Sequence, residues 1–467
     1  MTPEASKPLV LRDEIHGDIV FTGLVRQVID HEFFQRLRYI KQLGLGEYVF
    51  PCATHTRFQH SLGASHLASR YFRSMVSGWV HAPFKQDVET SGTRLLAAQT
   101  FECVTEVYKD KPSLEFWGQV TALAALLHDV GHGPWSHTFE QLELKQDFSE
   151  IVKKLPVLVR EYFSGLLGRY HHEDISVLYI FQILKDLEAG DYFLPVSLLV
   201  NKRMQNGALG TKFESHVEKP LQARGLKGGA PFHRLLRPLI SGPFDVDRID
   251  YIQRDGRNCG VSIGGIEWYR ILHKVLPCLA NYSGRAGEPK NVVLISNFRN
   301  QHVLDDFVFS LFQMYAQVYM HPKIVGFEEN IRKILQRVAG RKSPLTVTFE
   351  LHRSLTDDKF RELIRTQLGI SDVDSVLLRK PGFEVKVAHY PTDKATQKAL
   401  EVEGYEVVDL QNRPMMKDSA GVFLFSPAKV SGKSPYVFTP WVSVSPIAKQ
   451  FYDISYAPQI WAKTSST

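Results

Sequence analysis

Apolar residues recur at helical spacing through most of the first 340 residues, which predicts a chain built mainly from helices. Within residues 116–129, for example, Val120, Leu123, Ala124 and Leu127 fall on one face of a helix. We expect helices over residues 24–43, 61–80, 94–108, 116–129, 172–189, 301–318 and 325–338.

The segment 201–240 departs from this pattern. It is rich in glycine and proline, and it carries eight basic residues against two acidic ones. Two interpretations stay open for it: a mobile loop over an anionic ligand, or a solvated insertion without a ligand.

Beyond residue 342 the pattern changes to short runs of β-branched and aromatic residues bounded by turn residues, which predict strands. We expect strands over residues 345–349, near 376–378, over 383–387 and over 421–425, with a helix over 356–368. The expected fold is therefore mainly α. A helical domain would occupy residues 1–340, and a smaller C-terminal α/β subdomain and tail would occupy residues 341–467.

Composition narrows the class of protein. The 467 residues can form one large core or two domains. No apolar run reaches 18 residues and the N-terminus lacks the pattern of a secretory signal, so we expect neither a membrane helix nor export. Cys52, Cys103, Cys259 and Cys278 are widely spaced, which favours a reducing compartment over a disulfide frame or a thiolate zinc site. We expect a cytoplasmic protein, with a nuclear location left open. The net charge of +6 favours anionic ligands only mildly.

The candidate chemistry centres on His128 and Asp129, at the end of an Ala- and Leu-rich helix and just before glycines and a proline. Adjacent helical residues point in different directions, whereas a metal ion at the helix end can use both side chains. His-Asp pairs are common by chance, so further ligands are needed. They could come from residues 55–63, from His132 or His137, or from residues 245–255. Two histidines with two carboxylates suit iron, manganese, nickel or zinc, and such a metal can polarise a phosphoryl oxygen and activate water.

Five motifs jointly carry a resemblance: IHG at 15–17, FQRLRYIKQLG at 34–44, TRFQHSLG at 56–63, HDVGHGPWSH at 128–137 and DVDRIDYIQRD at 245–255. Together they resemble the HD-domain phosphohydrolases, and within that family the SAM- and HD-domain deoxynucleoside triphosphate triphosphohydrolases and their bacterial relatives. The matching region runs from about residue 8 to 325 with gaps. Because the sequence begins almost directly at it, we expect no SAM domain.

The resemblance implies a metal site made of His60, His128, Asp129 and Asp247. The expected cofactor is a divalent transition metal (Mn, Fe, Ni or Zn), and Mg²⁺ on the substrate phosphates is left open.

It also implies an acid and a set of phosphate contacts. His137 would protonate the departing nucleoside oxygen and His172 would lie beside the phosphates, with Glu140 and Glu173 orienting these rings. His132 would contact phosphate or support the ligands, although a bond to backbone at a helix end would explain it equally simply.

Five further positions match substrate contacts of the family, and Tyr251 is a sixth candidate. The resemblance implies that Arg57 and Arg248 bind phosphate, that Gln42 and Asp255 read the sugar 3′-hydroxyl, and that Tyr319 packs against the sugar. Tyr251 should share a helical face with Arg248. Both tyrosines could instead be ordinary core aromatics.

A nucleotide-activator site is less well matched. Asp30, Gln35 and Arg38 match its base-reading residues, but the family's other activator and pocket contacts are lost at Leu9, Leu311 and Met320. Packing alone would also explain Gln35 and Arg38. The resemblance further implies a homo-oligomer of unspecified size.

The leading prediction is metal-dependent hydrolysis of deoxynucleoside triphosphates to deoxynucleoside and triphosphate, favoured by Gln42, Asp255 and Tyr319. One alternative is an HD phosphohydrolase acting on another nucleotide or phosphate ester. Another is a nucleic-acid-binding protein with a secondary site, which the basic segment 201–240 favours although no nucleic-acid module is recognisable.

Overall fold

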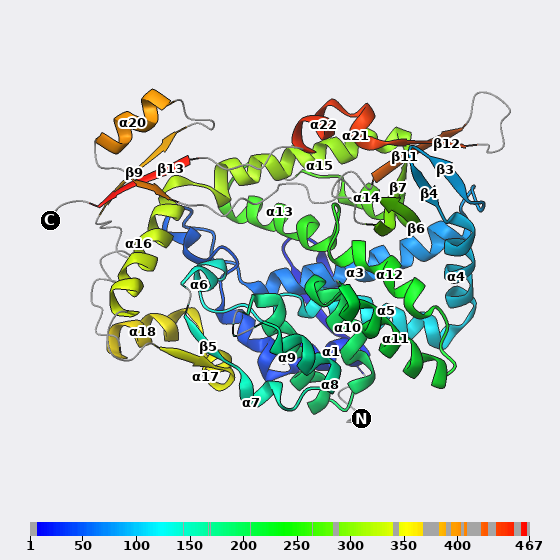
Figure 1. The fold of residues 1–467 in the computed structure, drawn as a ribbon, viewed down its shortest axis with the longest axis horizontal. Helices are drawn as coiled ribbons and strands as arrows, with labels where there is room; N and C mark the ends of the chain where they lie inside the picture. Colours follow the sequence, from blue (N-terminus) through cyan, green and yellow to red (C-terminus); the bar gives the residue numbers. More distant parts are fainter. Residues whose placement is uncertain are drawn as a thin grey trace.

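The computed structural model describes residues 7–142, 144–166, 168, 170–205, 207–263, 265–283, 289–339, 345–367, 383–388, 394–402, 406–408, 422–427, 436–452 and 459–464. Helices dominate this part of the chain (Figure 1), which confirms the mainly α class. Among the described helices, none combines the length and apolar character needed to cross a membrane.

The helices up to residue 260 are α1 (Gly23–Asp30), α2 (Glu32–Gln35), η2 (Arg36–Tyr39), η3 (Gly44–Tyr48), α3 (Arg57–Val80), α4 (Ala97–Lys109), α5 (Lys111–Leu127), α6 (His137–Gln141), α7 (Ser149–Val152), α8 (Val157–Ser164), α9 (His172–Asp186), η4 (Gly190–Tyr192), α10 (Phe193–Val200), η5 (Lys202–Gln205), α11 (Gly207–Ala223), α12 (Gly229–Ile240) and α13 (Val246–Cys259). The later helices are α14 (Trp268–Lys274), η6 (Phe298–Asn300), α15 (Gln301–Met314), η7 (Tyr315–Tyr319), α16 (Pro322–Ala339), α17 (Phe349–Ser354), α18 (Asp357–Gln367), α20 (Lys394–Val402), α21 (Trp441–Val444) and α22 (Pro446–Tyr452).

Local signals start the two central helices. The Thr56 amide donates to Gln59 Oε1 at 2.7 Å, which satisfies an amide ahead of α3 in the manner of a capping box. At the start of α5, the Asp110 side chain accepts the Ser113 amide at 3.0 Å. Helix α3 packs against both α5 and α13, so these helices form the frame of the molecule.

The prediction of one continuous helix over residues 24–43 is wrong, because the structure divides this segment into separate short helices. The chain is extended at His31, where ψ is 138°, and the His31 ring accepts the Phe33 amide at 3.2 Å. That bond caps a new helix and separates α1 from α2. The predicted helix over 94–108 likewise begins later, at Ala97, because residues 93–95 form strand β4.

The prediction of a mobile loop or insertion over residues 201–240 is also wrong, because η5, α11 and α12 cover most of its described residues. In α12, Phe232, Leu235, Leu236 and Leu239 are fully buried at helical spacing. The glycine and proline content concealed this pattern.

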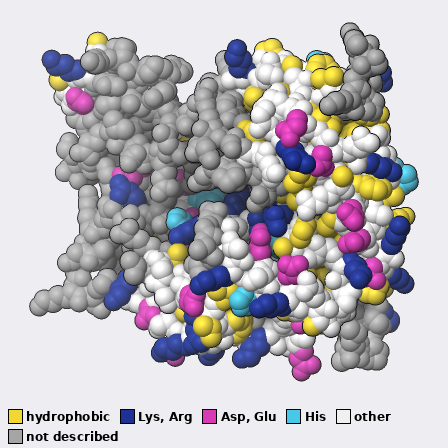
Figure 2. Space-filling model, turned by 45° about the vertical axis from the view of Figure 1, so that its right-hand side comes forward, with side chains coloured by type: hydrophobic (Ala, Val, Ile, Leu, Met, Phe, Trp, Pro, Cys, Tyr) yellow, Lys and Arg dark blue, Asp and Glu magenta, His cyan; other side chains and the backbone are white. Residues whose placement is uncertain are grey.

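Most of the basic side chains of this segment form ion pairs. Arg224 lies 2.6 Å from Asp191, Arg237 lies 2.8 Å from Glu214, and Lys212 lies 3.9 Å from Glu161. On the face shown in Figure 2, described Lys and Arg side chains lie intermixed with Asp and Glu. Segment 201–240 therefore gives little support to a nucleic-acid surface.

The largest sheet joins distant parts of the chain. Its strand order is β12-β11-β7-β6-β4-β3, and β11 pairs parallel to β7 with Val422 opposite Leu294. The strands are β3 (Val88–Thr90), β4 (Thr93–Leu95), β6 (Val275–Ser283), β7 (Pro289–Asn297), β11 (Val422–Pro427) and β12 (Tyr436–Pro440). The sequence after residue 340 thus adds two strands to a sheet begun by earlier residues. The two-part division at residue 340 stays a prediction.

Three smaller sheets complete the described structure: β1-β2, β5-β8 and β10-β13-β9. Their strands are β1 (Leu9–Asp13), β2 (Gly17–Phe21), β5 (Lys145–Asp147), β8 (Thr346–Thr348), β9 (Phe383–Ala388), β10 (Glu406–Val408) and β13 (Gln459–Thr464). The strands predicted at 345–349, 383–387 and 421–425 are confirmed as β8, β9 and β11, and the predicted helix 356–368 is confirmed as α18. The strand predicted near 376–378 lies outside the described residues.

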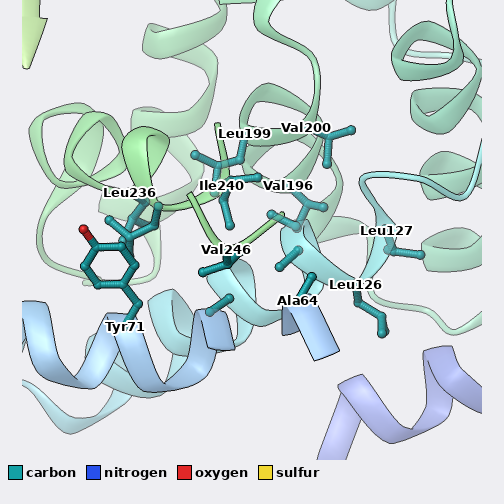
Figure 3. Packing of buried hydrophobic residues seen from close by; sticks show 14 of the residues in the cluster. Ala64, Tyr71, Leu126, Leu127, Val196, Leu199, Val200, Leu236, Ile240 and Val246 are labelled. Atoms are coloured by element: carbon teal, nitrogen blue, oxygen red, sulfur yellow. The ribbon is translucent and has the colours of Figure 1, made fainter. Parts of the chain in front are cut away.

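The core lies between the central helices. Figure 3 shows Ala64 and Tyr71 of α3 facing Val196, Leu199 and other buried residues of α10, α12 and the start of α13. Fully burying one such side chain contributes about 1.5–3 kcal/mol. This packing fixes the helix ends that carry the candidate site.

Candidate active site

Three helix ends meet at the candidate site. His60 lies in the first turn of α3, His128 directly follows α5, and Asp247 is the second residue of α13. Because α3 packs against both other helices, residues far apart in the sequence become neighbours here.

The donor atoms of these residues converge. His60 Nε2 lies 3.2 Å from His128 Nε2 and 3.1 Å from Asp247 Oδ1, and His128 Nε2 lies 3.5 Å from the same oxygen. Asp129 stands beside them, with Oδ1 3.4 Å from His128 Nε2 and Oδ2 3.6 Å from His60 Nε2. Two imidazole nitrogens this close repel each other if both are protonated, so the arrangement suits lone pairs directed at a shared cation.

The far nitrogens of both rings are held by acceptors. His60 Nδ1 donates to Asp250 Oδ2 at 2.9 Å, and His128 Nδ1 donates to the Ala125 carbonyl at 2.7 Å. These bonds leave each Nε2 as the free lone pair, which is the usual arrangement of metal-binding histidines.

The local field favours a positive charge at the same point. Burial alone would lower the pKa of His60, but Asp247 and Asp250 outweigh it and raise the pKa to about 10. Burial also opposes protonation of His128, yet Asp129 and Asp247 raise its pKa. The donor set therefore fits a divalent metal ion, and its mixed nitrogen and oxygen ligands suit Mn, Fe, Ni or Zn.

Gly63 makes room for the support of His60. A Cβ at residue 63 would overlap Asp250 Oδ1 and would lie 2.5 Å from Arg254 Nη2. The glycine of the 56–63 motif thus allows α13 to approach α3 closely enough for Asp250 to reach His60.

A second histidine cluster adjoins the first. Ligand atoms of His132, His137, Glu140 and His172 lie within 4.8 Å of one another. Glu140 orients two rings: His172 Nδ1 donates to Oε1 at 2.5 Å, and His137 Nδ1 faces Oε2 at 3.4 Å. Glu173 is less engaged, with Oε1 3.9 Å from His172 Nε2 and its side chain 41% exposed.

Charge is unevenly divided in this cluster. Burial would lower the pKa of His172, but Glu140 and Glu173 raise it to about 10, so the ring is a cation at neutral pH. Burial and Arg57 instead hold the pKa of His132 well below its usual value. The neutral His132 ring stacks on the His172 ring at a centroid distance of 4.0 Å. His137 is the accessible member, because 42% of its side chain is exposed.

Asp129 joins the two clusters. Its Oδ1 lies 3.3 Å from His132 Nε2, and its Oδ2 accepts a hydrogen bond from Arg57 Nη1. Burial would raise the pKa of Asp129, whereas Arg57 and His128 keep it well below the usual range. Arg57 also donates to Ser136 Oγ at 2.8 Å. The predicted phosphate contact thus lies directly beside the metal donors.

The predicted sugar contacts form a third group. The buried Asp255 accepts from Tyr319 Oη at 2.7 Å and from His55 Nε2 at 2.7 Å, one bond to each carboxylate oxygen. The Tyr251 ring lies between this group and the metal donors, with centroids 5.9 Å from Tyr319 and 6.5 Å from His60.

Gln42 and Arg248 occupy the edges of the site. Gln42 is buried and its carbonyl accepts Arg57 Nη2 at 3.4 Å, while its side-chain oxygen has no hydrogen-bond partner among the described residues. Arg248 donates to the Gly242 and Pro243 carbonyls at 2.9 and 3.2 Å, next to Asp247 on α13.

The residues predicted for an activator are brought together in part. Arg38 donates to Gln35 Oε1 at 2.6 Å and stacks 3.7 Å above the Phe58 ring. Arg38 also lines a cavity of about 510 Å³. Asp30 pairs with Arg26 at 3.6 Å instead.

Sequence reasoning assigned no individual role to Asp250, His16 or His55, although His55 and Asp250 lie in segments considered for metal ligands and His16 lies in the IHG motif. Asp250 follows Asp247 by three residues, so their shared helical face was a usable signal. His16 Nε2 donates to Asp250 Oδ1 at 2.7 Å, a contact between residues 234 positions apart that no local pattern reveals.

Comparison with known proteins agrees with this geometry. Residues 57–187 match the family described as HD domain, a range that contains the histidines of both clusters and Asp129 but not Asp247. The chain is 27% identical over 315 residues to an uncharacterized protein of Methanocaldococcus jannaschii, covering 68% of this chain and 46% of that one. It is 26% identical over 390 residues to deoxynucleoside triphosphate triphosphohydrolase SAMHD1 of Bos taurus, covering 79% and 56%.

The chain spans about half the length of the curated relatives it matches. A solved structure of a phosphohydrolase from Bacteroides thetaiotaomicron has a TM-score of 0.61 and 19% identity, with coverage of 98% of this chain and 100% of that one. At this identity the likeness shows a shared fold. The family match shows an HD domain at residues 57–187, and the relatives that this chain resembles include a protein named deoxynucleoside triphosphate triphosphohydrolase.

Proposed function

We propose that the protein is a metal-dependent phosphohydrolase that cleaves deoxynucleoside triphosphates into deoxynucleoside and triphosphate. The observation that carries the proposal is the shared Asp129. It contacts His128 at 3.4 Å on the metal side and His132 at 3.3 Å on the side of the second cluster. One carboxylate thus joins a cation site to a group of histidines suited to phosphate and proton transfer.

A metal held by His60, His128, Asp129 and Asp247 would, when bound, polarise a phosphoryl oxygen and supply activated water. The chain provides the remaining charge. Arg57 and the cationic His172 would bind the triphosphate, and Arg248 would extend this basic side from α13.

His137 would deliver the proton to the departing 5′-oxygen. Its ring is accessible, and its Nδ1 lies 3.4 Å from Glu140 Oε2, a contact that would hold the orientation of the ring. Because Glu140 serves both His137 and His172, one carboxylate would align the acid and the phosphate contact.

The deoxynucleotide assignment depends on the third group. Asp255 is fixed by His55 and Tyr319, and Gln42 offers a buried oxygen without a partner in the structure. These groups could bind a sugar hydroxyl in the manner that the family resemblance implies. Relatives from Bos taurus and Dictyostelium discoideum carry the name deoxynucleoside triphosphate triphosphohydrolase, which supports the same substrate class.

A product assay tests the proposal. Purified protein with Mn²⁺ is incubated with each of the four common dNTPs, with and without GTP, and triphosphate is separated from pyrophosphate and monophosphate. We expect triphosphate and deoxynucleoside in equal amounts. Pyrophosphate or monophosphate as the product would show that a phosphoanhydride bond of the dNTP is cut instead of the 5′-ester, and no turnover of any dNTP would refute the proposal.

Variants tie the activity to the site. His128→Ala and Asp129→Ala should abolish turnover. His216→Ala is the matched control, because His216 is an exposed histidine on α11 whose ring bonds the Lys212 carbonyl, away from the candidate site. Wild-type turnover in either site variant would contradict the metal assignment.

A further inference from the structure

A carboxylate from the C-terminal part of the chain reaches the candidate site. Asp357, the first residue of α18, accepts the Trp135 amide on Oδ1 at 2.8 Å and the Lys41 amide on Oδ2 at 3.0 Å. Its partners precede it by 222 and 316 residues, and the side chain is buried. A carboxylate at a helix start commonly caps its own helix, whereas both oxygens here serve other segments.

The backbone held by Asp357 is strained. Trp135 and Ser136 have φ angles of +56° and +54°, a region that non-glycine residues rarely adopt. Such a conformation persists only where surrounding contacts enforce it. The next residue is His137, so this turn determines where the candidate acid lies.

Asp357 also links two sides of the site. Lys41 precedes Gln42, and the Lys41 carbonyl accepts the Ser136 hydroxyl at 2.6 Å. Ser136 in turn accepts Arg57 Nε at 2.8 Å. One carboxylate therefore fixes the spacing between the segment with the candidate acid and the segment with a predicted sugar contact.

A second connection runs in parallel. The buried Arg36 donates to the Leu355 carbonyl at 3.2 Å and to the Val130 and His132 carbonyls at 3.3 and 2.6 Å. Phe360, one turn after Asp357, packs against Trp135 with ring centroids 5.1 Å apart. Residues 355–360 are thus bonded to both ends of the 130–137 loop.

We propose that Asp357 is a positioning residue: it enforces the strained Trp135–Ser136 turn and thereby sets His137 and the Lys41–Gln42 segment in register around the substrate. The inference rests on the proposed function, because it takes His137 as the acid. It makes turnover depend on residues 355–360, which lie outside the HD-domain match at 57–187.

The test is Asp357→Asn. Asparagine has one acceptor oxygen, so its amide group must face one of the two backbone N–H groups. The matched control is Asp358→Asn, which removes the same charge from the exposed neighbouring residue. A misplacement of about 1 Å can cost about 100-fold in rate. We expect kcat per folded molecule to fall about 100-fold in Asp357→Asn and to be unchanged in the control, with the Mn²⁺ Kd within about threefold of wild type in both.

A double variant separates positioning from general destabilisation. If Asp357 acts through His137, Asp357→Asn should lower kcat little further in a His137→Ala background, because the two changes remove one function. A full additional 100-fold loss in that background, or wild-type kcat in Asp357→Asn, would overturn the inference.

Amide hydrogen exchange tests the contact between Asp357 and the 130–137 loop without measuring turnover. The peptide spanning 130–142 should exchange faster in Asp357→Asn, while peptides of α3 and α5 stay protected. Unchanged exchange in 130–142 would also overturn the inference. If no dNTP is hydrolysed by the wild type but exchange rises as expected, the proposed function fails while the connection from Asp357 to the loop stands.

Discussion

Truncating Asp250 should weaken metal binding through His60, although Asp250 itself is not a proposed ligand. The Asp250 carboxylate accepts His60 Nδ1 at 2.9 Å, His16 Nε2 at 2.7 Å, and two nitrogens of Arg254 at 2.8 and 2.9 Å. His60, Asp250 and Arg254 are fully buried. In Asp250→Ala the His60 ring loses the acceptor that holds its orientation and tautomer.

Two effects of different size follow from this environment. Removing one partner of a buried ion pair typically costs about 3–5 kcal/mol. Arg254 keeps Asp13 at 3.0 Å, so we expect a loss near the lower limit, about 3 kcal/mol in the unfolding free energy of the metal-free protein. Losing the partner of a metal-binding histidine costs about 10- to 100-fold in metal affinity, or about 1.4–2.7 kcal/mol.

The assay must separate these effects. Urea unfolding of the metal-free protein gives the stability change, and chelator competition for Mn²⁺ under conditions where the variant is folded gives Kd. His16→Ala is the control, since it removes another bond to the same carboxylate but leaves the His60–Asp250 bond in place. We expect its Mn²⁺ Kd to stay within about threefold of wild type. A wild-type Kd in Asp250→Ala, or an equal loss in His16→Ala, would refute the reasoning.

Three other predictions concern the same region. Glu140→Gln removes the main charge that raises the pKa of His172 to about 10. A raised histidine pKa keeps the ring cationic to higher pH, and the stabilisation from this charge is lost as the pH rises toward 10. In the variant the ring should titrate closer to 6.5, which ¹⁵N-histidine NMR would detect directly and which would move the alkaline limb of kcat/KM to lower pH. An unchanged titration would contradict this. Gly63→Ala should lower the unfolding free energy by about 1–3 kcal/mol or more, because its Cβ overlaps Asp250; wild-type stability in urea would show that the helices can separate freely. Chelation should abolish turnover and lower Tm, and Mn²⁺ at 100 times Kd should restore about 2.7 kcal/mol of stability; a Tm indifferent to metal would argue against the site.

The residues of the candidate site could be predicted from the sequence where they lie in local motifs. His60, His128 and Asp247 each lie at or beside a helix end marked by recognisable residues, and the structure brings their donor atoms together. The roles of these residues in catalysis stay predictions. The resemblance supplied the combination, because three separate motifs do not themselves specify that their helices pack side by side.

The residues that support the site, such as Asp357, could not be predicted, because their contacts join segments far apart in the sequence. Asp357 contacts Trp135 across 222 residues, and β11 pairs with β7 in a register that only the folded core specifies. The error over 201–240 has a different cause. Glycine and proline lower intrinsic helix preference, but burial of the apolar face of α12 overrides that preference.

The helix ends add only modest charge to the site. The C-terminus of α5 carries partial negative charge and favours a cation at His128, whereas the N-termini of α3 and α13 favour anions. The first turns of α3 and α13 hold the metal donors His60 and Asp247 as well as the predicted phosphate contacts Arg57 and Arg248. Each such interaction is worth about 0.3–1 kcal/mol at an exposed helix end. That is small beside the effect expected from one supporting carboxylate such as Asp250. The side chains therefore decide affinity, while the geometry of three converging helices decides on which side of Asp129 the metal and the phosphates would lie.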